Sequence, residues 1–122
     1  ESRGLGDVYK RQIKDRDKFK KREKAFTVPT SITFDNDGSE IYTLIEVDTR
    51  DRPGLLFDLT KALANMNVYI ASAVIATYGE QVVDTFYVKD TFGLKFHSHS
   101  KQRALEDKLR AAIELGVKRA EL

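Results

Sequence analysis

Residues 41–63, with the sequence IYTLIEVDTRDRPGLLFDLTKAL, pass from a strand pattern to a helix pattern across one short turn, and this change decides the fold. On a strand, residues 41–48 would place Ile41, Thr43, Ile45 and Val47 on one face and Tyr42, Leu44, Glu46 and Asp48 on the other, so both faces are partly apolar. Pro53 then sets a helical φ, and Asp51 just before it can accept hydrogen bonds from the free amides of a first helical turn. Leucines recur at helical spacing from Leu55 to Leu63. We therefore predict a strand, a tight turn and an amphipathic helix.

Two hairpins surround this helix in the predicted order of elements. Residues 32–34 and 41–48 form the first, joined through an Asp-Gly turn at 35–38 in which Gly38 tolerates a positive φ. Residues 68–78 and 82–89, rich in β-branched and aromatic side chains, flank Gly79 and predict the second. A last helix, capped by Ser100, should end at Gly116. The order ββαββα predicts a ferredoxin-like α+β domain, with one four-stranded antiparallel sheet and both helices on one face.

The composition is typical of a globular protein with a single domain. The 122 residues are 41% hydrophobic and 33% charged, with a net charge of +2 and no cysteine. No apolar run approaches the ~20 residues that cross a bilayer, and the first residues lack the pattern of a secretory leader. We therefore expect a cytoplasmic protein with no membrane partner.

The first 26 residues carry no pattern of the predicted domain. Residues 6–12 resemble a translated sequencing-adapter scar, so residues 1–12 are interpreted as non-native or disordered, and the chain as the C-terminal part of a longer protein. Residues 13–26 are mostly basic and are expected to form a linker or a solvated helix. The predicted domain therefore covers residues 27–122.

A candidate ligand site lies in the turn at residues 48–56. Free amides at a helix N-terminus, with the positive end of the helix dipole behind them, attract a carboxylate or a phosphate. Gly54 has no Cβ, so a ligand can approach that backbone closely. A helix start that is simply well capped explains the same residues, and their spacing alone does not decide between the two interpretations.

The turn resembles the signature of ACT domains, which bind amino acids and regulate enzymes. The resemblance runs from the turn motif at residues 51–56 through Leu59, Ala62 and Leu63 to residues 67–70. The second hairpin, up to Asp90, extends it to the last ACT domain of the bacterial bifunctional uridylyltransferase/uridylyl-removing enzymes, over residues 18–120. ACT domains commonly have the order βαββαβ, and the strand that here precedes the core fits the permuted version found in that enzyme family.

That resemblance implies a function. The paired C-terminal ACT domains of this enzyme family sense glutamine, and thereby bias uridylylation against deuridylylation of the nitrogen signal protein PII. The nucleotidyltransferase domain, which uses Mg and UTP, and the metal-dependent phosphohydrolase domain would both lie upstream. We expect no catalytic residue, cofactor or metal in this chain. The rival interpretation is a structural pairing module that binds no ligand.

The resemblance also implies the ligand-binding residues. Main-chain amides of the turn would hold the charged backbone groups of the ligand, with Asp51 beside its ammonium. The facing wall would be residues 67–70, which in ACT assemblies often come from a paired domain, in the same enzyme or in a second copy. Tyr42 and Leu44, on the sheet face without helices, are expected to lie under that paired domain. The candidate set is Asp51, Arg52, Pro53, Gly54, Leu55, Leu56, Asn67, Val68, Tyr69 and Ile70.

Two further signals are weaker. His97 and His99 could suggest a metal, but the sequence offers no third ligand nearby, so a solvated loop is the prediction. Asp84 lies within an apolar strand, and the sequence places no His, Lys or Cys partner beside it, which favours an edge or interface position over catalysis.

Nucleic acid is not an expected partner. The basic segment 13–26 is interleaved with acidic residues, so charge alone does not indicate a nucleic-acid arm. Tyr42, Phe86 and Tyr87 could stack on RNA bases across a ferredoxin-like sheet, but no basic residues surround them in the sequence.

Overall fold

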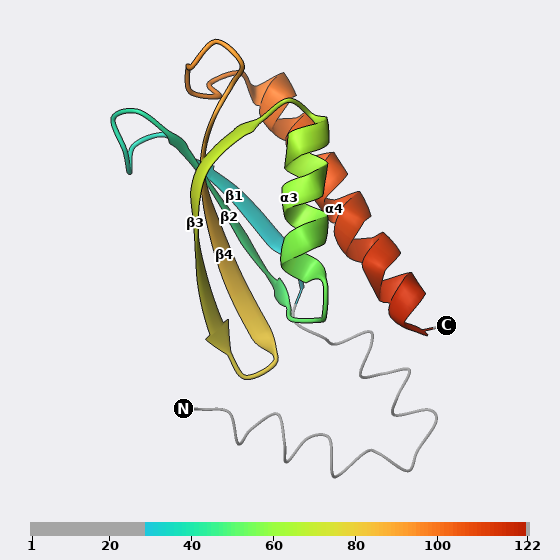
Figure 1. The fold of residues 1–122 in the computed structure, drawn as a ribbon. Helices are drawn as coiled ribbons and strands as arrows, with labels where there is room; N and C mark the ends of the chain where they lie inside the picture. Colours follow the sequence, from blue (N-terminus) through green and yellow to red (C-terminus); the bar gives the residue numbers. More distant parts are fainter. Residues whose placement is uncertain (1–28, 122) are drawn as a thin grey trace.

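The computed structural model describes residues 29–121, so the predictions for segments 1–12 and 13–26 lie outside the described residues. The order of elements is ββαββα, as predicted (Figure 1). The elements are β1 (Ser31–Asp35), β2 (Thr43–Arg50), α3 (Leu55–Asn65), β3 (Tyr69–Tyr78), β4 (Gln81–Lys89) and α4 (His99–Glu121).

The four strands form one antiparallel sheet in the order β1-β2-β4-β3. Both helices lie on one face of it, side by side (Figure 1). This arrangement confirms the predicted ferredoxin-like α+β fold. It places β2 and β4 in the middle of the sheet and leaves β3 at an edge, with no described strand on its outer side.

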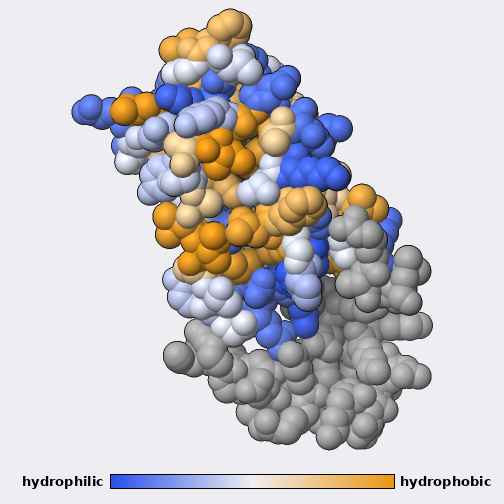
Figure 2. All heavy atoms as spheres, in the orientation of Figure 1, coloured by the Kyte–Doolittle hydropathy of each residue, from blue (hydrophilic) through white to orange (hydrophobic). Residues whose placement is uncertain are grey.

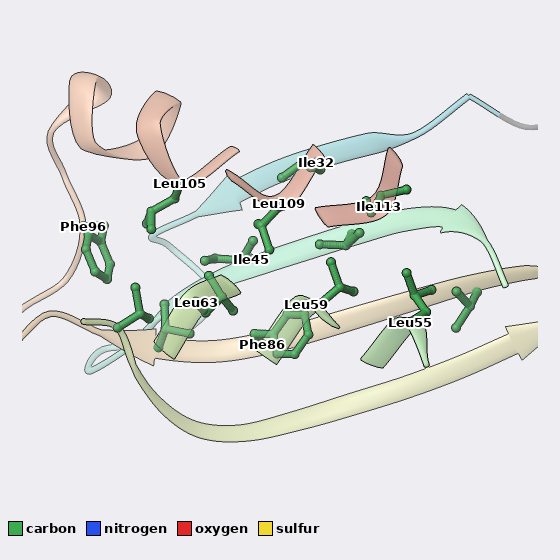
Figure 3. Packing of buried hydrophobic residues seen from close by; sticks show 14 residues of the cluster. Ile32, Ile45, Leu55, Leu59, Leu63, Phe86, Phe96, Leu105, Leu109 and Ile113 are labelled. Carbon is green, nitrogen blue, oxygen red and sulfur yellow. The ribbon is translucent and has the colours of Figure 1, made fainter. Parts of the chain in front are cut away.

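The core fills the layer between the sheet and the helices. Every second residue of β2 and β4 is buried, as the alternation in the sequence predicts. Leu59 and Leu63 of α3 and Leu109 of α4 pack against this face, and Phe86 of β4 is 0% exposed at its centre (Figure 3). Burying a side chain of this size contributes about 1.5–3 kcal/mol relative to leaving it in water.

The loop of the first hairpin differs from the prediction. The hairpin itself is confirmed, since β1 and β2 pair antiparallel, but Gly38 does not have a positive φ. Its amide and that of Asp37 instead donate to Oδ1 of Asp35, at 3.2 and 2.8 Å. A Cβ on Gly38 would lie 2.9 Å from Oδ2 of Asp35. The glycine therefore serves a close approach to a carboxylate, which the turn pattern alone does not reveal.

Helix α4 differs from the prediction at both ends. It begins at His99, and the Lys101 amide donates to Oγ of Ser98 at 3.4 Å, so Ser100 is not the cap. The helix also does not end at Gly116 but runs through it to Glu121. The reason is a contact with a residue 64 positions earlier. The Arg52 guanidinium lies against the helix at this point, and a Cβ on Gly116 would come within 1.9 Å of its Nη2. Gly116 therefore leaves room for the Arg52 guanidinium and does not end the helix.

Arg52 connects the start of α3 to α4. Its Nη2 forms an ion pair with Oδ2 of Asp58 at 2.9 Å and donates to the carbonyl of Ala112 at 3.3 Å. Its Nη1 donates to the carbonyl of Pro53 at 3.1 Å. The Arg52 side chain is only 11% exposed, so this contact, which we call the Arg52 clamp, is largely shielded from water.

Gly116→Ala should therefore destabilise the protein, although alanine is normally better than glycine in a helix by about 1 kcal/mol. The new Cβ displaces the guanidinium, and losing hydrogen bonds to a charged group costs about 1.5–3 kcal/mol. We expect a net loss of about 1 kcal/mol in the free energy of unfolding, measured by urea denaturation. In an Arg52→Ala background the same substitution should instead stabilise. Stabilisation in both backgrounds would contradict the clamp.

Candidate ligand site at the start of helix α3

The turn between β2 and α3 leaves the helix start open. Gly54 caps α3 with a left-handed backbone, φ 79°, and no described side chain accepts from the first-turn amides. The expected cap by Asp51 is therefore wrong, since its carboxylate makes no such bond. The Asp51 amide instead donates to the carbonyl of Glu80 at 2.8 Å, which ties the turn to the β3–β4 hairpin. The Leu55 amide donates to the carbonyl of Arg52 at 3.2 Å, while the amides of Leu56 and Phe57 have no described acceptor and, with the positive end of the helix dipole, stay available to an anion.

A hollow lies beside this turn. It has a volume of about 460 Å³ and lies between the β2–α3 turn and the tip of the β3–β4 hairpin, where Gly79 has φ 66°. Its lining residues are Arg50, Asp51, Arg52, Pro53, Gly79 and Glu80. Arg50 and Glu80 form an ion pair with each other at 2.9 Å and Arg52 pairs with Asp58, which leaves Asp51 as the charged lining residue without a described ion-pair partner.

The predicted turn residues do not all face this opening. Pro53, Gly54 and Leu56 are exposed, but Leu55 is 3% exposed and belongs to the core. The Arg52 cation is held in the Arg52 clamp. Backbone groups, rather than the Arg52 side chain, are therefore what the turn offers a ligand.

The second part of the predicted site, residues 67–70, lies at the other end of α3 (Figure 1). Asn67 has φ 62° just beyond the end of the helix, Val68 is buried, and Tyr69 is 55% exposed. A helix of 11 residues is about 16 Å long. One chain therefore does not bring these residues to the turn at residues 51–56, and only a neighbouring domain could place such a wall opposite it.

Asp84 is a buried polar residue whose position differs from the one predicted. It lies on β4, a central strand, and is 1% exposed, so the expected edge or interface position is incorrect. Its side chain shares the helix-facing side of β4 with Val82 and Phe86, and no described residue donates a hydrogen bond to its Oδ1. Burial, and secondly the negative charge of Asp51, raises the pKa of Asp84 to about 6. The alternation of β4 was the signal that could have placed it on the buried face.

The other candidate residues lie in the loop before α4, at the first position of α4, where His99 stands instead of in the predicted loop, and in the core. His97 and His99 are exposed, and the described residues contain no group of three side chains suited to a metal. Phe86 is buried, so it cannot stack on a base as the RNA interpretation requires. Within residues 29–121, no helix is long and apolar enough to cross a membrane.

The uncovered apolar surface gathers on the edge strand. Tyr69, Val74, Ile75 and Tyr78 of β3 are each at least 45% exposed. Figure 2 shows hydrophobic side chains in a band over β3 and the adjoining part of α3. Tyr42 and Leu44, by contrast, are half-buried and therefore less exposed than these residues of β3. A long edge strand with apolar residues and no charge invites pairing with another strand.

Comparisons with known proteins agree on one family. A family model described as an ACR9-like, ACT-like domain matches residues 31–119. The chain is 73% identical over 116 residues to a bifunctional uridylyltransferase/uridylyl-removing enzyme of Ruegeria pomeroyi, a match that covers 94% of the chain and 13% of the enzyme. The enzymes of the same name from Cereibacter sphaeroides and Azospirillum brasilense are 67% and 49% identical, over 94% and 75% of the chain and 12% and 10% of each enzyme. No solved structure matches.

The chain thus spans about an eighth of the length of the curated relatives that it matches. Most of the sequence of these relatives therefore has no counterpart in this chain.

Proposed function

The chain belongs to the ACT-like domain family, and from this premise we propose that it is an amino-acid-sensing regulatory domain of a uridylyltransferase/uridylyl-removing enzyme. The observation that carries the proposal is the start of α3. Gly54 leaves the first-turn amides without a side-chain cap, beside a hollow with charges of both signs. A free amino acid has a carboxylate for the amides and an ammonium for the acidic groups.

Glutamine is the amino acid we propose as ligand. The support is the similarity, over 94% of the chain, to two enzymes whose name combines the addition and the removal of a uridylyl group. An enzyme with two opposed activities needs a signal that favours one of them, and a ligand can do so only through different affinities for two states. In this proposal the enzyme acts on PII in the cytoplasm, its upstream domains use Mg and UTP, and glutamine is the signal.

Pairing with another ACT domain is part of the same proposal. The exposed apolar residues of β3 support it, because patches of this kind on soluble proteins commonly mark interfaces. A paired domain could also supply the wall that residues 67–70 of this chain do not form at their own turn. The pairing partner is either the neighbouring domain in the enzyme or a second copy.

Calorimetric titration of glutamine into the 122-residue chain, and into the whole enzyme, tests the sensor proposal. We expect saturable heat that is selective for glutamine over glutamate and leucine, with the whole enzyme binding more tightly if a paired domain completes the site. Absence of heat in both samples would contradict the proposal.

A structural pairing module without a ligand is the second candidate function. The uncharged edge strand β3, exposed along most of its length, favours it independently of any ligand. In that case glutamine would give no heat, while the chain would still associate in sedimentation experiments.

A further inference from the structure

Asp84 carries a carboxylate oxygen with unused hydrogen-bonding capacity inside the domain. The residue is 1% exposed, and no described residue donates to its Oδ1. A buried polar group without a partner costs free energy, and native proteins rarely retain one. Such exceptions tend to occur where a protein binds something, because function is what offsets the cost.

The side chain points toward the start of α3. Along β4, Val82, Asp84 and Phe86 alternate onto the face that the helices cover. Figure 3 shows Leu59 of α3 beside Phe86, and Leu55, one helical turn earlier, further toward the start of β4. Asp84 lies between Phe86 and Val82 on that face, so it sits under the first turn of α3. This is the turn whose amides have no side-chain cap.

The neighbours of Asp84 on the two adjoining strands differ in exposure. Val47 lies opposite it on the central strand β2, and Ile75 lies opposite it on the edge strand β3. Ile75 is 45% exposed, and Leu56 in the first turn of α3 is 41% exposed. On this face, the partly exposed Ile75 therefore lies between the carboxylate and the open edge of the sheet.

The charge around Asp84 favours a cation. Asp51, on the turn, is the charged group whose field acts on it, and both are acidic. Arg52, the basic residue in the turn just before α3, is held by Asp58 and by α4. A positive group placed between the start of α3 and β4 would relieve the repulsion between the two carboxylates.

We propose that the Asp84 carboxylate accepts the ammonium group of the amino acid whose own carboxylate binds the amides at the start of α3. The inference rests on the proposed function and assigns its ammonium contact to a buried residue that the turn motif does not include. Asp51, the partner expected from the sequence, is exposed, and an ion pair there is screened by water. The pair with Asp84 forms away from water, where charge-assisted hydrogen bonds are strongest.

The test compares glutamine with 4-carbamoylbutanoate, which is glutamine without its amino group. Calorimetry would measure both compounds on the unaltered protein, on Asp84→Asn and on Asp51→Asn, each in the chain and in the whole enzyme. We expect the unaltered protein to bind glutamine about ten-fold or more tightly than the analogue, as one charge-assisted hydrogen bond allows. In Asp84→Asn this preference should fall to about three-fold or less, while Asp51→Asn should keep most of it.

The outcomes separate the two claims. If the unaltered protein binds neither compound, the proposed function fails and this inference fails with it. If it prefers glutamine but Asp84→Asn keeps the full preference, the sensor proposal stands and the Asp84 contact is overturned. Loss of the preference in Asp51→Asn alone would show that Asp51, in the turn, binds the ammonium group instead of Asp84. Far-UV circular dichroism of each variant would show that it is folded.

Discussion

Asp84→Asn is expected to raise the free energy of unfolding at pH 8 by up to about 3 kcal/mol, although it removes a charged residue from a folded protein. The pKa of Asp84 rises from 3.8 to about 6 on folding because burial disfavours its charged form. Each pH unit of that difference corresponds to about 1.4 kcal/mol, lost when the buried group must ionise. Asparagine has nearly the same shape and never ionises, so it avoids this cost.

The sign of the effect follows from proton binding. Between pH 3.8 and about 6 the folded protein holds the Asp84 proton more tightly than the unfolded chain does. The contribution of Asp84 to stability is therefore most favourable below pH 3.8 and is lost as the pH rises through 6. Urea denaturation of both proteins should show equal stability near pH 4 and a widening gap up to about pH 7.

Asp48→Asn is a matched control for this prediction. Asp48 is half-buried on the other face of the sheet and accepts a hydrogen bond from Gln81, so it has the partner that Asp84 lacks. It should not be stabilised by the change to asparagine. If Asp84→Asn lowers stability at pH 8 instead, the carboxylate has a native partner, and the inference built on its unused oxygen is wrong.

Gly54→Val should weaken glutamine binding by about ten-fold or more in affinity. Gly54 has φ 79°, a conformation that a β-branched residue adopts only with strain of about 1–2 kcal/mol. The turn would relax away from this geometry, and the added methyl groups would cover the amides that the ligand needs. Calorimetric titration of the variant measures the loss directly.

Gly93→Val separates this local effect from backbone strain in general. Gly93 also has φ 79°, and a Cβ there would meet nothing within 4 Å. It lies in the loop between β4 and α4, away from the turn. Both variants should lose similar stability, but only Gly54→Val should lose the ligand. Equal loss of binding in both variants, or in neither, would contradict a site at the start of α3.

Much of the fold could be predicted because its signals are local. The alternation along β2 and β4, Gly79 between two β-rich segments, and the leucines of α3 each reflect a period that a few neighbouring residues encode. These segments formed where they were predicted, with bounds shifted by a few residues. The open start of α3 also follows from local chemistry, since Gly54 allows a left-handed cap.

Some of the errors concern residues whose role depends on distant partners. Gly116 reads as a helix stop, yet a guanidinium from Arg52 fills the space beside it. Residues 67–70, predicted as a wall that a paired domain often supplies, lie at the opposite end of α3 from the turn of their own chain, so the turn that they face stays a prediction.

The order of elements, the ferredoxin-like architecture and the turn that begins α3 were all predictable, because sterics and hydrophobic periodicity act over a few residues. Which side chains that turn meets depends on the packing of the folded domain. Arg52 turns away to contact α4, and Asp84 lies on the buried, helix-facing side of β4. Contacts of this kind depend on how the helices pack across the sheet, and packing brings together residues that are far apart in the chain.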